Sequence, residues 1–160
     1  MRKFAIVLLS VICLTSMSGC GLLNGLFRKT SYLERVEERL GLSLDDVQVL
    51  EEWDTHGGFH GDGETFVKMS VPDGFEQTLG IGETVDGKAG DGWYALPLTG
   101  TAYGYFYEWG GLFEHPETGE RVIPEISNGY WYYTATGAMN WDFAILDIDE
   151  NILYFYEYDS

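Results

Sequence analysis

The sequence predicts an α+β domain in which one N-terminal amphipathic helix packs on a mainly antiparallel sheet of about six strands. Three observations lead to this fold class. A segment starting at Ser31 carries a helix start signal, an apolar face and a stop signal. After Gly41 the chain changes to short β-branched and aromatic runs separated by Gly, Asp and Asn. The apolar fraction is 45%, of which the aromatic residues alone make 16% of the chain, enough to build a core.

The helix is expected to begin at Ser31 and to run for about ten residues. Ser31 and Glu34 have the spacing of a capping box, in which the hydroxyl accepts the backbone N–H of Glu34 and the Glu34 side chain reaches back. Leu33, Val36 and Leu40 then fall on one helical face. Gly41 follows the last of them and is a typical helix stop.

The remaining elements are expected to be strands, because each run is rich in residues that favour sheets and is bounded by turn formers. Asn128-Gly129 is the strongest signal for a hairpin turn, since both residues tolerate a positive φ. Asp149-Glu150-Asn151 is expected to join the last two strands as a tight hairpin. No internal repeat is present, so residues 31–160 are expected to form a single domain. The expected strands are 47–53, 64–71, 103–109, 130–136, 143–148 and 152–158.

The first 20 residues contain the parts of an export signal in the usual order. Arg2 and Lys3 give a positive start, residues 4–14 form an apolar run, and small residues precede Cys20. The apolar run is too short for a permanent membrane span, which needs roughly 20 residues.

The segment Met17-Ser18-Gly19-Cys20 resembles the lipobox cleaved by lipoprotein signal peptidase. This resemblance implies that residues 1–19 are a lipoprotein signal peptide, that Cys20 carries a diacylglycerol, and that residues 20–30 are a tether. The domain is then expected to be lipid-anchored at the extracytoplasmic face of the cell membrane, because acyl chains contribute about 0.8 kcal/mol per buried CH2. The alternative is an ordinary cleaved signal in which Cys20 is incidental.

The chain is strongly acidic, with 26 acidic residues, nine basic residues and a net charge of −17. Loss of Arg2 and Lys3 with the signal would take the net charge to −19. Nucleic acid and bare anionic surfaces are therefore poor partners. Cys13 and Cys20 are the only cysteines, so the expected mature domain has neither a disulfide nor a thiol nucleophile.

Residues 54–64 are the stretch most suggestive of a site, because they place two histidines and several carboxylates within a short distance of sequence. Imidazole and carboxylate are zinc ligands when cysteine is absent. Four glycines in the same stretch make a helix very unfavourable, so the spacing of the histidines carries no ligand geometry. In the alternative interpretation the glycines form turns, and Asp54 and His56 bond loop backbone. The candidate metal ligands are His56, His60, Asp62 and Glu64.

The chain also resembles small uncharacterised lipoproteins of Gram-positive bacteria. The resemblance is carried by residues 53–64 (Trp-Asp-Thr-His-Gly-Gly-Phe-His-Gly-Asp-Gly-Glu), by Asn128-Gly129-Tyr130 and by residues 153–160. It covers most of the expected mature chain. It implies the architecture alone, because the family brings no assigned activity.

A second candidate site lies in the aromatic run at residues 103–109. On a strand, Tyr103, Tyr105, Tyr107 and Trp109 would share one face. Such a row suits stacking on sugar rings of a cell-wall glycan. The alternative interpretation is that these residues simply favour sheets and fill the core.

No sequence motif for a nucleophile, a phosphate loop or a dinucleotide site is present, and no cofactor is indicated. We therefore expect a non-enzymatic binding or interaction module at the cell envelope, with a cell-wall glycan or an envelope protein as its partner. The alternative is a metal-assisted hydrolase centred on residues 56–64.

Overall fold

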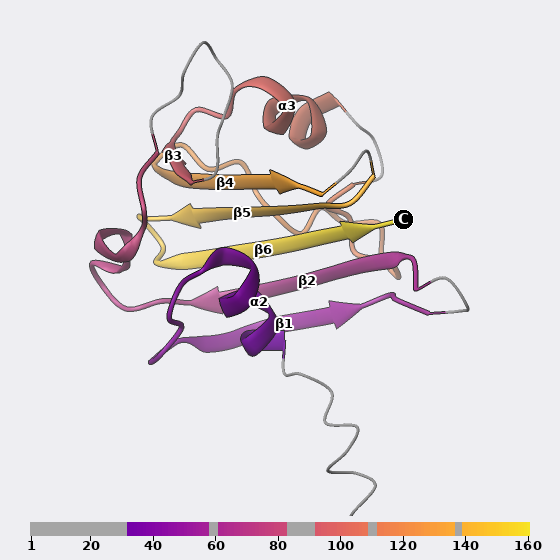
Figure 1. Ribbon diagram of the computed structural model, residues 1–160, viewed down its shortest axis with the longest axis horizontal. Helices are drawn as coiled ribbons and strands as arrows, with labels where there is room; N and C mark the ends of the chain where they lie inside the picture. Colours follow the sequence, from indigo (N-terminus) through magenta and orange to yellow (C-terminus); the bar gives the residue numbers. More distant parts are fainter. Residues whose placement is uncertain (1–31, 58–60, 83–91, 109–111, 137–138) are drawn as a thin grey trace, which may run out of the picture. The chain divides into compact units, whose positions relative to one another are not determined.

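Six strands form one sheet in the computed structural model, which describes residues 32–57, 61–82, 92–108, 112–136 and 139–160. The strands are β1 (Gln48–Asp54), β2 (Gly63–Ser70), β3 (Trp93–Ala95), β4 (Gly129–Ala135), β5 (Trp141–Asp147) and β6 (Ile152–Asp159). Their order is β1-β2-β6-β5-β4-β3, and every neighbouring pair is antiparallel. With a few short helices this sheet confirms the α+β class. Figure 1 shows β6, in yellow, between β5 and β2 in the interior of the sheet.

The first described helix, α2 (Tyr32–Leu40), lies over one face of the sheet (Figure 1). Val36 and Leu40 are buried in a cluster with residues of β2, β5 and β6, as the spacing predicts. The helix ends at Leu40; the N–H of Gly41 still donates to the carbonyl of Glu37 at 2.9 Å, and the φ of 64° at Gly41 then turns the chain away. The predicted capping residue Ser31 lies outside the described residues.

Both faces of the sheet are covered, so β5 and β6 are buried on both sides. Ala144 of β5 and Leu153 of β6 belong to the cluster under α2. Their chain neighbours Phe143 and Tyr154 belong to the cluster on the opposite face. This alternation follows from the two-residue period of a strand. It explains why these strands read as nearly continuous apolar runs in the sequence.

The opposite face is covered by residues 96–108 and 112–126, which include the short helices α3 (Gly100–Tyr103) and η2 (Gly104–Glu108). Phe106 of η2 stacks on Phe143, with ring centroids 5.6 Å apart. Phe113 is fully buried and packs on Tyr156, with ring centroids 4.6 Å apart. The remaining short helix, η1 (Phe75–Thr78), buries Phe75 in the cluster under α2.

The predicted strand at residues 103–109 is wrong, because Tyr103 ends α3 and residues 104–108 form η2. Ala102 and Phe106 are both buried four residues apart, which is the spacing of one helical face. Trp109 lies outside the described residues. Strand β3 is not among the predicted strands, since three residues are too few to show a period.

The predicted hairpin turn at Asn128-Gly129 is also wrong. Neither residue has a positive φ, and Gly129 is the first residue of β4, paired with Asp147 of β5. A Cβ atom on Gly129 would lie 1.8 Å from the carbonyl oxygen of Leu146. This position therefore requires glycine because two strands approach closely, and not because the chain turns.

The hairpin between β5 and β6 is confirmed, and Asn151 adopts a φ of 53° within it. The Asp147 carboxylate accepts the backbone N–H groups of Asp149 and Glu150 at 3.0 and 3.2 Å, which fixes the turn. None of the helices in the described ranges is long and apolar enough to cross a membrane.

Candidate functional site

The His56 side chain is bonded to its own loop. Asp54 Oδ1 accepts the backbone N–H of His56 at 2.8 Å and lies 2.7 Å from His56 Nδ1. Thr65 Oγ1 lies 3.3 Å from the same ring nitrogen. The neighbouring Thr55 is held by Glu64, whose carbonyl accepts the Thr55 N–H at 2.9 Å. These contacts give Asp54 and His56 a role in closing the loop.

The four candidate metal ligands are not gathered at one point in the described part of the chain. Glu64 and Thr65 are successive residues of β2, so their side chains leave on opposite faces, and His56 is on the side of Thr65. His60 lies outside the described residues. Among the described residues no group of three His, Cys, Asp or Glu side chains has the geometry to hold a metal ion, Asp62 included.

The aromatic candidates form a pair on a helix and not a row on a strand. Tyr103 and Tyr107 are one turn apart, each about half exposed, with ring centroids 4.9 Å apart and planes tilted by 43°. Tyr105 points elsewhere and packs between Tyr133 and Trp141. Within the described ranges, the large exposed aromatic side chains are therefore those of Tyr103 and Tyr107.

The helical segment that carries Tyr103 and Tyr107 is held in place by contacts of Phe106 and Arg121. Phe106, between the two tyrosines in sequence, is buried against the sheet. The Arg121 guanidinium lies 4.1 Å over the Phe106 ring and donates to the Phe106 carbonyl at 2.8 Å. The same guanidinium donates to the Ile123 carbonyl at 2.9 Å. These contacts position the helix that presents the two exposed rings.

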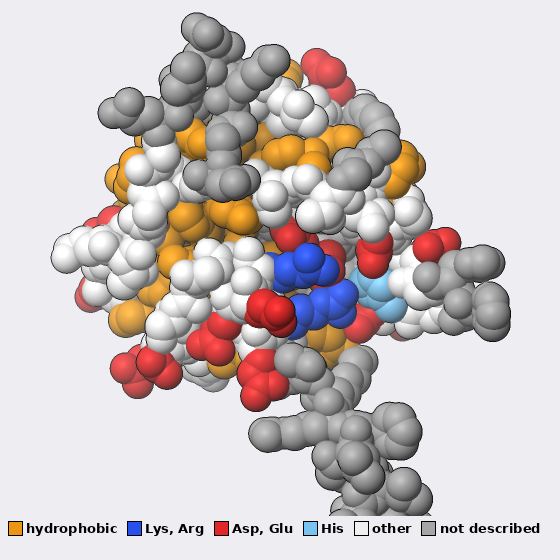
Figure 2. Space-filling model, viewed as in Figure 1, with side chains coloured by type: hydrophobic (Ala, Val, Ile, Leu, Met, Phe, Trp, Pro, Cys, Tyr) orange, Lys and Arg blue, Asp and Glu red, His pale blue; other side chains and the backbone are white. Residues whose placement is uncertain are grey.

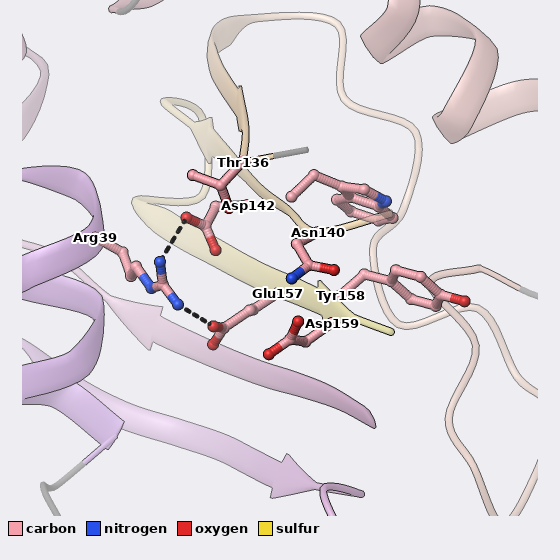
Figure 3. Close-up of a pocket in the computed structure, with 8 residues that line it drawn as sticks. Arg39, Thr136, Asn140, Asp142, Glu157, Tyr158 and Asp159 are labelled. Carbon is pink, nitrogen blue, oxygen red and sulfur yellow. Dashed lines mark hydrogen bonds and ion pairs between the residues drawn. The ribbon is translucent and has the colours of Figure 1, made fainter. Parts of the chain in front are cut away.

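A second polar cluster lies where α2 meets the sheet. Asp142 of β5 and Glu157 of β6 are directly opposite each other, and both are buried on the face covered by α2. Arg39 reaches down from α2, and its Nη2 donates to Glu157 Oε1 at 2.7 Å (Figure 3). Arg35 Nε lies 2.7 Å from Glu157 Oε2, but its N–H does not point at this oxygen, so the contact is an ion pair only. Figure 2 shows Lys and Arg side chains gathered on this face with Asp and Glu side chains around them.

Asp142 has fewer and longer contacts with positive side chains than Glu157 has. Its side chain is 8% exposed, and its closest cation, Arg39 Nη1, is 3.9 Å from Oδ2, beyond hydrogen-bond distance. Within the described part of the chain no hydrogen bond reaches this carboxylate. Burial raises the pKa of Asp142 to about 6, Arg39 opposes the rise, and the nearby Glu157 carboxylate adds to it.

A small pocket opens beside this carboxylate pair (Figure 3). Its volume of about 30 Å³ admits one or two water molecules and is far below the several hundred Å³ of a small-molecule site. The pocket lining consists of Arg39, Thr136, Asn140, Trp141, Asp142, Glu157, Tyr158 and Asp159.

Sequence reasoning missed this pair, although a signal for it exists. Asp142 and Glu157 each interrupt an aromatic run, between Trp141 and Phe143 and between Tyr156 and Tyr158. The predicted turn at residues 149–151 also sets the register that brings the two carboxylates opposite each other.

The chain matches no protein-family model, and no similar protein is found among curated sequences or solved structures.

Proposed function

We propose that this chain is a lipoprotein anchored through Cys20 at the extracytoplasmic face of the cell membrane, and that its domain is a non-enzymatic binding module. The location is supported by the order of positive, apolar and small residues before Cys20. The excess of acidic residues makes the domain itself a poor ligand for an anionic membrane, so the lipid supplies the attachment.

The binding surface that we propose is the exposed pair Tyr103 and Tyr107, and this pair is the observation that carries the assignment. Tyrosine rings on a surface suit recognition, because each offers an apolar face and a hydroxyl at low cost in conformational entropy. The support from Phe106 and Arg121 keeps the rings in place before a ligand arrives, which reduces the entropy lost on binding.

The ligand class that best fits this surface is an uncharged stretch of cell-wall glycan. The apolar faces of sugar rings stack on tyrosine, and the sugar hydroxyls pair with the tyrosine hydroxyls. Polyanionic envelope polymers fit less well, because the net charge of −17 repels them. A metal-assisted hydrolase has less support, since the described residues hold no candidate metal group.

Sedimentation with purified, insoluble cell-wall glycan tests this proposal. The Tyr103→Ala, Tyr107→Ala double variant should bind about 5- to 150-fold more weakly, if each ring contributes about 0.5–1.5 kcal/mol as in aromatic pairs. The matched control is a Leu50→Ala, Met139→Ala double variant, which removes two similarly exposed apolar side chains elsewhere. Equal sedimentation of the two double variants would refute the assigned surface. Failure of the unaltered protein to bind glycan would refute the ligand class.

A further inference from the structure

The carboxylate pair at the base of α2 is the strongest feature that the binding proposal leaves unused. Two acidic side chains are directly opposite each other on adjacent strands and are both nearly excluded from water. Two arginines face them, but they are shared unequally: Glu157 has both within 2.7 Å, whereas Asp142 has only Arg39, at 3.9 Å. Asp142 has no hydrogen bond from the described residues, and it lines the pocket, so a further partner can reach it from there.

Three kinds of partner fit a pocket of this size: a metal ion, a water molecule and a proton. A metal ion has no support, since no three His, Cys, Asp or Glu side chains of the described residues are arranged so that they could hold one. Water fits the volume of about 30 Å³, but it leaves the buried negative charge in place. A proton removes the negative charge of Asp142 and turns one of its oxygens into a hydrogen-bond donor, opposite the acceptor oxygens of Glu157.

We propose that Asp142 and Glu157 form a proton-binding carboxyl pair, and that uptake of one proton by Asp142 in mildly acidic solution strengthens the attachment of α2 to the sheet. The proton comes from solvent through the pocket and forms an O–H bond on Asp142. That O–H then donates to the Glu157 side chain, which both arginines hold in place. Arg39 is thereby released from its competition between two carboxylates. This inference does not depend on the proposed glycan binding.

The charged groups facing Asp142 agree with this assignment. The two positive groups come from α2, and both lie nearer to Glu157 than to Asp142. The two negative groups come from β6, whereas β4 presents the uncharged Thr134 directly opposite Asp142. The charged groups are Arg35, Arg39, Glu157 and Asp159. Burial and the two acids together outweigh the arginines, so the pKa of Asp142 rises from 3.8 to about 6.

The direction of the pH effect follows from this shift. The folded protein binds the Asp142 proton more tightly than the unfolded chain does, so folding is favoured when pH falls. The gain begins as pH drops through about 6 and is complete below 3.8. The two pKa values imply that the folding equilibrium constant increases by roughly 100-fold across this window on account of Asp142 alone.

Carboxyl-carbon NMR of the protein labelled with ¹³C-aspartate tests the proposal directly. One aspartate signal should titrate with a pKa of about 6, and this titration should vanish in Asp142→Asn. The matched control Asp159→Asn removes the same charge from the same pocket, and should retain the high titration. A high titration that survives in Asp142→Asn, or its absence from the wild type, would overturn the assignment. A midpoint that falls when millimolar calcium is added, beyond the effect of equal ionic strength, would show that the pocket takes a cation instead.

Urea unfolding at pH 7 and pH 5 tests the effect on stability. The measured quantity is the factor by which the folding equilibrium constant increases from pH 7 to pH 5. This factor should be about tenfold smaller for Asp142→Asn than for the wild type, because the asparagine side chain is neutral at both pH values. Asp159→Asn should keep most of the wild-type gain, because Asp159 is the weakest of the groups that raise the pKa of Asp142. Identical gains in all three proteins would mean that Asp142 takes no part in the pH response.

Discussion

Replacement of Gly129 by alanine is the sharpest test of the sheet register. The added Cβ would lie 1.8 Å from the Leu146 carbonyl oxygen and 3.0 Å from its carbonyl carbon. Both are backbone atoms of β5, so no side chain can move aside to make room. The first residues of β4 must therefore separate from β5 by more than about 1 Å, which breaks hydrogen bonds between the strands and loosens the packing of Tyr130.

The expected cost is about 3 kcal/mol, within a range of about 1.5–6 kcal/mol. It comes from one or two lost backbone hydrogen bonds at about 0.5–1.5 kcal/mol each and from disturbed core packing at about 1–3 kcal/mol. For a domain of this size that corresponds to a fall in Tm of about 10 °C, measurable by circular dichroism. Gly80→Ala is the matched control, because nothing lies within 4 Å of a Cβ at that position. It should leave stability within about 1 kcal/mol of the wild type.

A second substitution at Gly129 distinguishes the observed strand pairing from the hairpin turn that the sequence alone predicts. In an Asn-Gly hairpin turn, Gly129→Asn would cost little, because asparagine tolerates a positive φ. In the structure, asparagine brings the same Cβ clash as alanine and should cost at least as much. Near-wild-type stability of Gly129→Asn would refute the described register of β4 against β5.

Three further outcomes are expected. Cys20→Ser should abolish incorporation of a fatty-acid analogue, and retained label would contradict the proposed anchor. Phe113→Ala should cost about 3–5 kcal/mol in urea unfolding, because this fully buried ring contacts both Tyr156 and Phe143; a loss below 1 kcal/mol would mean that the segment is not packed as described. Both Asn151→Ala and Asn151→Gly lose the hydrogen bond to Asp73 Oδ1 at 2.8 Å, but alanine should cost about 1 kcal/mol more than glycine, because the φ of 53° disfavours a Cβ-bearing residue other than asparagine or aspartate. Equal melting temperatures for the two Asn151 variants would argue against the left-handed turn.

The elements that the sequence predicts correctly are those with local signals. Helix α2 has an apolar face and a glycine stop, and the hairpin between β5 and β6 has a turn whose acidic and amide side chains bond its own backbone. Strands β1 and β2 show enough alternation or β-branched content to be recognised. Each of these signals acts within a few residues, so no knowledge of the tertiary structure is needed.

The errors have a different origin. Residues 102–107 fit the period of a strand and the period of a helix. The alternate tyrosines suit a strand. The pairs Ala102 and Phe106, and Tyr103 and Tyr107, are each four residues apart and suit a helix. The choice between helix and strand depends on how this segment packs on the sheet face opposite α2, and that tertiary contact cannot be read from the local sequence. The turn prediction at Gly129 is wrong for the same reason. The glycine is required by the close approach of Leu146, which exists only when β4 and β5 are paired. The predicted aromatic row assumed a strand, and on the observed helices Tyr105 turns inward while Tyr103 and Tyr107 remain exposed.

The place of β6 in the sheet has a consequence for how this domain is made. Ribosomes and translocons deliver a chain from its N-terminus, and β2 emerges long before the strand that pairs with its inner edge. Until Ile152–Asp159 arrive, the β1-β2 hairpin and the β3-β4-β5 sheet have no hydrogen-bonded connection to each other. Pairings between segments distant in sequence form slowly, since the intervening chain must first be ordered. The complete sheet is therefore expected to form late in folding, when β6 pairs with β2 on one side and with β5 on the other. For a chain that we propose is exported, such delayed closure keeps the polypeptide threadable throughout its passage across the membrane.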